Sequence, residues 1–123
     1  MPIHKEKSGL FVFDYPPHPE TFIIELIDDG RTVHARRILS GVEKNQVHVS
    51  GIVVKAPAPY NPPWNFHLSP GSIQFFGLAV EVCDASIRYV AEHLDEVGGA
   101  FLPDGRWCPW GSRLLHELPP VQG

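Results

Sequence analysis

The chain has no cluster of basic residues and no long apolar run. Its 10 Lys and Arg residues are spread singly or in pairs, and its formal net charge is −4. A nucleic-acid interface needs a basic patch or stripe, so we expect no nucleic-acid partner. No apolar run approaches the roughly 18 residues that indicate a transmembrane helix, so we expect no membrane partner either.

The N-terminus also lacks a targeting signal. The opening MPIHKEKSGLFVF has no apolar stretch followed by small residues, which is what a signal peptide requires. The expected location is therefore cytoplasmic, although a leader removed earlier would leave the same sequence.

The familiar catalytic and metal-binding patterns are missing as well. The two cysteines form no C-x-x-C, and the seven histidines form neither H-x-H nor H-E-x-x-H. There is no G-x-S-x-G elbow and no phosphate-binding glycine loop. We therefore expect no cofactor and no metal, and no thioredoxin-like or zinc-ribbon site.

What the chain does contain is typical of one globular domain over residues 1–123. It is 43% hydrophobic and 20% charged. Its 13 prolines gather between apolar segments, where they mark stiff connections. Residues 1–8 and 119–123 are expected to be flexible ends.

The apolar patterns predict an α+β fold: a mostly antiparallel sheet of about five strands with two helices packed on it. The segment 73–83 reads as a central strand buried on both faces, and Gly51 as a bulge. Asp84 reads as the N-cap of the second helix, and Gly41 as the residue that ends the first. Strands are expected over 10–13, 21–27, 47–54, 73–83 and 113–118, and helices over 30–40 and 85–97.

Three stretches at strand ends or in loops carry most of the unusual side chains: 60–67, 81–84 and 107–113. Five aromatic residues in the first and third stretches are expected to form one stacked cluster. That cluster is either a small core under the loops or a stacking platform for a ligand, with Asn61, Asn65 and His67 supplying hydrogen bonds. The five are Tyr60, Trp64, Phe66, Trp107 and Trp110.

Three titratable residues are candidates for catalysis, namely His67, Glu81 and Asp84. Each has a structural alternative. His67 can be hydrogen-bonded within its loop, and Asp84 can cap a helix. Glu81 lies in an apolar run, so its carboxylate needs a cationic partner or a raised pKa. An ion pair that fixes the aromatic loop is the alternative to a general acid or base.

Cys83 and Cys108 allow one pairing. A disulfide between them would close a loop of about 25 residues and stabilise the fold by roughly 3 kcal/mol on the chain-entropy model. A cytosolic location would instead keep the thiols reduced. Both states remain open from the sequence.

Several blocks are similar to a family of small, mostly uncharacterised bacterial proteins. The chain resembles that family in ARRILSG (35–41), YNPPWNFHL (60–68), EVCDASIRYVAEHLDEVGGAFLP (81–103) and WCPWGSR (107–113). The likeness runs from residue 10 to about 118. It implies no catalytic residue. Related domains resemble adhesion or binding modules, which favours recognition. Many relatives have Asp where Ser69 stands, so a calcium site there would not carry over.

The favoured hypothesis is a recognition module for a small molecule or protein, using the aromatic loops 59–68 and 104–113. One alternative is a small enzyme or metalloprotein that uses His67, Glu81, Asp84 and the two cysteines. Another is a homodimer that pairs strand 10–13 with its copy. The candidate ligand-binding residues are Tyr60, Asn61, Trp64, His67, Trp107, Trp110 and Arg113.

Overall fold

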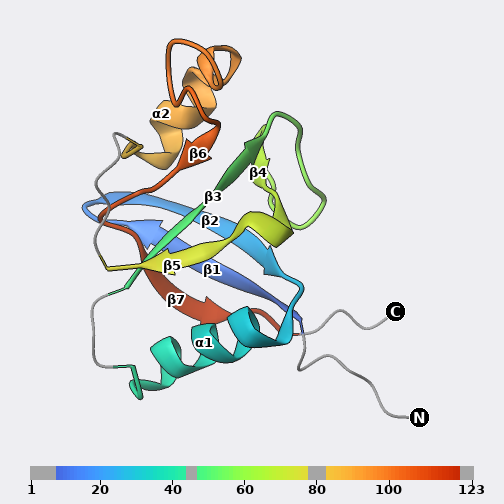
Figure 1. The fold of residues 1–123 in the computed structure, drawn as a ribbon, viewed down its shortest axis with the longest axis vertical. Coiled ribbons are helices and arrows are strands. Elements are labelled where there is room, and N and C mark those ends of the chain that lie inside the picture. Colours follow the sequence, from blue (N-terminus) through green and yellow to red (C-terminus); the bar gives the residue numbers. More distant parts are fainter. Residues whose placement is uncertain (1–7, 44–46, 78–82, 120–123) are drawn as a thin grey trace.

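The computed structural model describes residues 8–43, 47–77 and 83–119 (Figure 1). The described residues contain two α-helices and seven strands in two antiparallel sheets. This confirms the α+β class. The expectation of one sheet with about five strands is wrong. The two additional strands are each only two residues long, too short to leave a pattern in the sequence. The predicted flexible ends fall almost wholly outside the described residues.

The first sheet has the order β2-β1-β7. Its central strand is β1 (Gly9–Tyr15), with β2 (His18–Leu26) and β7 (Arg113–Glu117) antiparallel on its two sides. The expectation that residues 10–13 pair with their copy in a dimer is therefore wrong, because β2 and β7 already occupy the two edges of β1. The oligomeric state itself stays a prediction.

The second sheet is built around β3 (His48–Val54). Three short strands pair with it in antiparallel fashion: β4 (His67–Leu68), β5 (Gln74–Phe76) and β6 (Arg106–Trp107). A 3-10 turn, η2 (Pro70–Ser72), separates β4 from β5.

Residues 74–76 form a strand, but the expectation that it is a central strand buried on both faces is wrong. Gln74 is exposed, Phe75 and Phe76 are only half-buried, and β5 pairs with β3 alone among the described strands. A further part of the predicted strand, residues 78–82, lies outside the described residues. Gly51 is no bulge in the pairing of β3 with β6, where it lies in regular register opposite Trp107. A Cβ at Gly51 would come within 3.0–3.1 Å of the Ile73 and Leu68 side chains. The lack of a side chain at Gly51 therefore allows these two side chains to lie close to the backbone of β3.

Helix α1 (Asp29–Ser40) forms where a helix is predicted over 30–40, and it ends at the predicted glycine. The Asp28 side chain accepts a hydrogen bond from the Arg31 N–H at 2.7 Å, which is an N-cap. Gly41 ends the helix with φ of +85°. The helix lies beside β7 (Figure 1), where Arg36 pairs with Glu117 at 2.8 Å.

Helix α2 (Ile87–Glu92) is shorter than predicted and has a different cap. Its N-cap is Ser86, whose hydroxyl accepts from the Tyr89 N–H at 3.2 Å. The expectation that Asp84 caps this helix is wrong, because other groups use its carboxylate. A 3-10 turn, η3 (Leu94–Glu96), follows, and α2 with η3 lies at the opposite end of the molecule from α1 (Figure 1).

Four aromatic side chains, all 0% exposed, occupy the centre of the core. Phe13 and Phe22 come from the first sheet, Trp107 from the second, and Phe66 from the residue before β4. Neighbouring ring centroids lie 4.9–5.9 Å apart in tilted or edge-on geometry, as favourable aromatic pairs do. This group therefore joins the two sheets.

Candidate functional site

The stretch 59–68 covers the free edge of β2. The Asn61 Oδ1 accepts a hydrogen bond from the Ile23 N–H at 2.9 Å, and the Trp64 Nε1–H donates to the Thr21 carbonyl at 2.7 Å. Two side chains thus satisfy backbone groups that a neighbouring strand would otherwise pair. Covering an edge in this way also hinders pairing with other chains.

The five aromatic residues do not form one cluster. Phe66 and Trp107 are fully buried in the core, and Trp64 packs half-buried against Phe22 at a centroid distance of 6.4 Å. Within the described residues, Trp110 is 41% exposed and contacts none of the other four rings. The core interpretation therefore accounts for the buried pair.

Tyr60 is the fifth member and stands apart from the others. Its ring lies edge-on to His67 at a centroid distance of 6.3 Å. Its buried hydroxyl has no hydrogen-bond partner among the described residues. Burial, followed by the charge of Glu25, raises the Tyr60 pKa to about 12.

His67 is held by its own loop. Its Nδ1 lies 2.7 Å from the Ala56 carbonyl oxygen, so this nitrogen is the donor. That is the structural alternative for His67. Glu81 lies outside the described residues. No group of three or more His, Cys, Asp or Glu side chains in the described part of the chain is placed to hold a metal.

Cys83 and Cys108 form a disulfide with a Cα–Cα distance of 5.0 Å, and both are nearly buried. While bonded, neither sulfur is a thiolate nucleophile or metal ligand. Disulfides persist mainly in oxidising compartments, so the bond weighs against the expected cytoplasmic location, which stays a prediction. No helix among the described residues is long and apolar enough to cross a membrane.

The disulfide and three hydrogen bonds link the segments 83–85 and 107–110. The three hydrogen bonds use consecutive residues of the first segment. Together with the disulfide, these three bonds hold one segment against the other more firmly than the disulfide would alone. The bonds run from the Cys108 N–H to the Cys83 carbonyl (2.7 Å), from the Trp110 N–H to Asp84 Oδ1 (3.0 Å) and from the Trp107 Nε1–H to the Ala85 carbonyl (2.8 Å).

The Asp84 carboxylate joins the second of these segments to β1. Its Oδ1 accepts from the Tyr15 hydroxyl at 2.7 Å as well as from the Trp110 N–H. Burial, then the hydrogen bond to Asp84 and the charge of Asp84, raises the Tyr15 pKa to about 12. Both bonds fall on Oδ1, so Oδ2 accepts none from the described residues.

Arg113, another candidate from the sequence, pairs across the first sheet. Its Nε lies 2.9 Å from Asp14 Oδ1, and this bond raises the pKa of the guanidinium above its usual value. The Arg113 side chain is 63% exposed, and such surface pairs contribute little to stability.

A pocket of about 380 Å³ opens beside the disulfide. It brings Asp84 together with residues 100–106. The predicted loop 104–113 contains Asp104 and Arg106, whereas residues 100–103 were not among the predicted site residues. Five lining residues are apolar in character and three are charged. The lining consists of Cys83, Asp84, Ala100, Phe101, Leu102, Pro103, Asp104 and Arg106.

Leu102, in the wall of this pocket, has an uncommon backbone conformation. Its φ is +47°, and its side chain is 4% exposed. Such conformations persist only where surrounding contacts enforce them. Here the Leu102 carbonyl accepts from the N–H groups of both Gly98 (2.9 Å) and Gly105 (2.8 Å).

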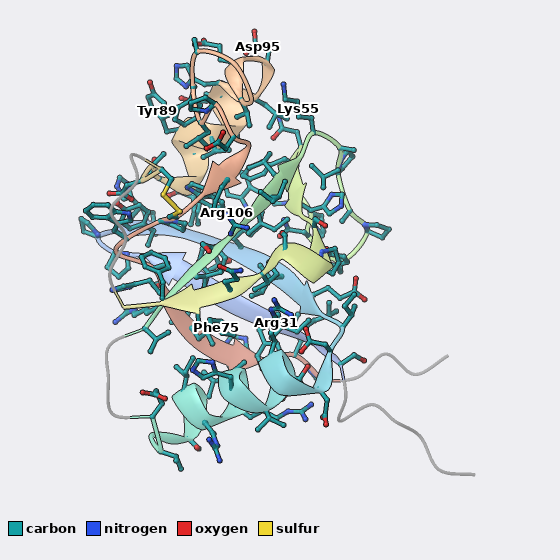
Figure 2. The ribbon with its side chains drawn as sticks, in the orientation of Figure 1. Arg31, Lys55, Phe75, Tyr89, Asp95 and Arg106 are labelled. Atoms are coloured by element: carbon teal, nitrogen blue, oxygen red, sulfur yellow. A yellow bond between two sulfur atoms is a disulfide. The ribbon has the colours of Figure 1, made fainter. Side chains whose placement is uncertain are left out.

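Phe101 links the pocket to two aromatic residues at α2. Its ring lies edge-on to Tyr89 at 5.1 Å and to His93 at 6.3 Å, and these two stack at 3.9 Å. Tyr89 is 47% exposed. Figure 2 shows Tyr89 on α2 and Arg106 on β6, in the same upper part of the molecule.

The fold and the pocket define an α+β protein with a disulfide-braced cavity. The chain belongs to the BP-74 N-terminal domain family, whose model matches residues 7–121. Comparison with curated proteins and with solved structures found no significant match. The family match agrees with the resemblance to a small family, while the bacterial distribution of that family stays a prediction.

Proposed function

We propose that this protein is a recognition module that binds a small ligand in the pocket formed by residues 83–84 and 100–106. The observation that carries the proposal is the lining of the pocket. The apolar residues Phe101, Leu102 and Pro103 line the pocket together with the charged residues Asp84, Asp104 and Arg106. Ligand sites typically combine an apolar wall with a few polar groups that orient the ligand.

The surroundings of the pocket favour binding because they are braced before any ligand arrives. One wall is held by the disulfide and the three hydrogen bonds between segments 83–85 and 107–110. The other is held by the two bonds to the Leu102 carbonyl. A site that is already ordered loses less entropy on binding.

The proposal keeps part of the surface inferred from the sequence. Trp110 retains an exposed ring, and its N–H contacts the pocket residue Asp84. Asn61 and Trp107 are 1% and 0% exposed, so their side chains support the fold. The loop 104–113 therefore contributes to recognition more directly than the loop 59–68.

A small enzyme is the second hypothesis, and Asp84 is the residue that favours it. Asp84 is one of the residues that line the pocket, and its carboxylate has one oxygen without a partner among the described residues. A carboxylate in a cleft can serve as a general acid or base. His67 and the bonded cysteines add nothing to this hypothesis.

The proposal can be tested by fragment screening with two-dimensional NMR. Binding should shift the amide signals of residues 83–84 and 100–106 together. Ala100 is exposed and lines the pocket, so Ala100→Trp should block binding without removing core contacts. Val42→Trp, at a position 64% exposed on another face, is the matched control. Fragments that shift other surfaces but never this pocket would contradict the proposal.

A further inference from the structure

The pocket holds charges of both signs that are not paired with each other. Arg106 is half-buried, and its Nη1 donates to the Ser50 hydroxyl at 3.0 Å. It has no carboxylate partner among the described residues, unlike four other arginines. Those four pairs are Arg31 with Asp28, Arg36 with Glu117, Arg88 with Glu20 and Arg113 with Asp14.

A half-buried guanidinium favours an anion in its surroundings. Partial removal from water costs its N–H groups hydrogen bonds to solvent unless other acceptors replace that solvent. The hydroxyl of Ser50 satisfies one of the five N–H donors of Arg106. The planar guanidinium suits two parallel hydrogen bonds to a carboxylate, so a ligand carboxylate is the group that Arg106 selects best.

The opposite charge in the pocket comes from Asp84 and Asp104. Oδ2 of Asp84 accepts no hydrogen bond from the described residues, and Asp104 is exposed without a partner among them. The two negatively charged carboxylates suit an ammonium group, because its three N–H groups can donate hydrogen bonds to both.

We propose that the ligand is a zwitterion of the amino-acid type. This inference rests on the proposed function. The ammonium group binds Asp84 and Asp104, the carboxylate binds Arg106, and an apolar substituent packs against Phe101 and Pro103. The pocket volume of about 380 Å³ lies within the range of small-molecule sites. A ligand with only one of the two charges would leave part of the pocket unpaired.

The test compares four ligands that share one aromatic ring, titrated by calorimetry and by NMR. They are phenylalanine, phenethylamine, 3-phenylpropionate and N-acetylphenylalaninamide, so the charges are both, positive only, negative only and none. Charged hydrogen bonds typically contribute 1.5–3 kcal/mol, which corresponds to about 10- to 100-fold in Kd. Phenylalanine should therefore bind at least about 10-fold more tightly than each of the others.

Two variants separate the charges. Arg106→Gln should bring the affinity for phenylalanine down to that of phenethylamine and leave phenethylamine unchanged. Asp104→Asn should weaken phenylalanine and phenethylamine but not 3-phenylpropionate. Arg106→Lys keeps the charge and should restore part of the affinity. Arg37→Gln, which removes an exposed arginine on α1, is the control and should change nothing.

The outcomes distinguish this inference from the function beneath it. If the neutral amide binds as tightly as phenylalanine with the same pocket shifts, the recognition site stands and the zwitterion inference is wrong. If 3-phenylpropionate binds as tightly as phenylalanine, the pocket recognises a carboxylate alone, as at a peptide C-terminus, and the inference is also wrong. If the fragment screen too gives no pocket shift, the proposed function fails as well.

Discussion

The Asn61 side-chain oxygen lies 2.9 Å from the Ile23 backbone nitrogen, 38 residues away in the chain, and accepts its hydrogen bond. The Asn61 amide also donates to the Phe66 carbonyl at 3.3 Å. One buried amide thus satisfies the edge of β2 and shapes the loop that covers it.

Asn61→Ala should lower the free energy of unfolding by about 1–3 kcal/mol, because it leaves the partly buried Ile23 N–H without its acceptor. Asn65→Ala is the matched control, since the exposed Asn65 amide donates only to the Ala91 carbonyl, and it should cost less than about 1 kcal/mol. Urea unfolding measures both. Equal losses would show that the cover over β2 does not depend on Asn61.

The regular elements of this fold were largely predictable, because their signals are local. Gly41 marks the end of α1 in the sequence, and the apolar runs mark β1 and β2. The role of 59–68 was not predictable. Its aromatic and amide groups serve backbone atoms of a distant strand, and no spacing within the loop reveals that partner.

Tyr15 makes the stability of the fold sensitive to alkaline pH. Its pKa is raised from 10.0 to about 12, chiefly by burial and then by Asp84. The folded state therefore favours the protonated hydroxyl. The resulting stability is fully present below pH 10 and is lost as the pH rises towards 12. Urea unfolding between pH 8 and 12 should show this decline, and Tyr15→Phe should show a smaller one. Because Tyr60 also has a pKa of about 12, ultraviolet titration should show two tyrosine transitions near pH 12 in the wild type and one in Tyr15→Phe.

Tyr89→Phe is the control for this experiment, because it removes the hydroxyl of a side chain that is 47% exposed. A decline of the same size in wild type and in Tyr15→Phe would rule out the link between Tyr15 and alkaline unfolding.

Gly111 keeps the Tyr15 ring in place. A Cβ at Gly111 would lie 2.5 Å from Cε1 and 2.9 Å from Cδ1 of that ring, which is far inside normal contact. Gly111→Ala should therefore move the ring, break its bond to Asp84 and lower the Tyr15 pKa. Gly71→Ala is the control, since no atom lies within 4 Å of its added Cβ. Unchanged titration of Tyr15 in Gly111→Ala would contradict this arrangement.

The candidate site was predictable only in part. Asp84 and the cysteines were selected from the sequence, but Asp84 was assigned to a helix that Ser86 caps instead. A carboxylate just ahead of a helix pattern looks like a cap. Its actual partners lie 69 and 26 residues away. The wall at 100–103 depends on the positive φ of Leu102, and the presence of a leucine does not predict that conformation.

Replacing both cysteines by serine tests how the pocket is braced. Their 25-residue separation implies a loss of roughly 3 kcal/mol in the free energy of unfolding on the chain-entropy model. The three hydrogen bonds between segments 83–85 and 107–110 remain available, so the variant should still fold and keep the core signals of Trp107. Ligand affinity should fall, because the wall at Cys83 must then be ordered on binding. Wild-type protein in excess reductant is the control and should behave like the variant. If both bind as tightly as the oxidised protein while stability drops, the disulfide supports the fold alone and does not preorganise the pocket.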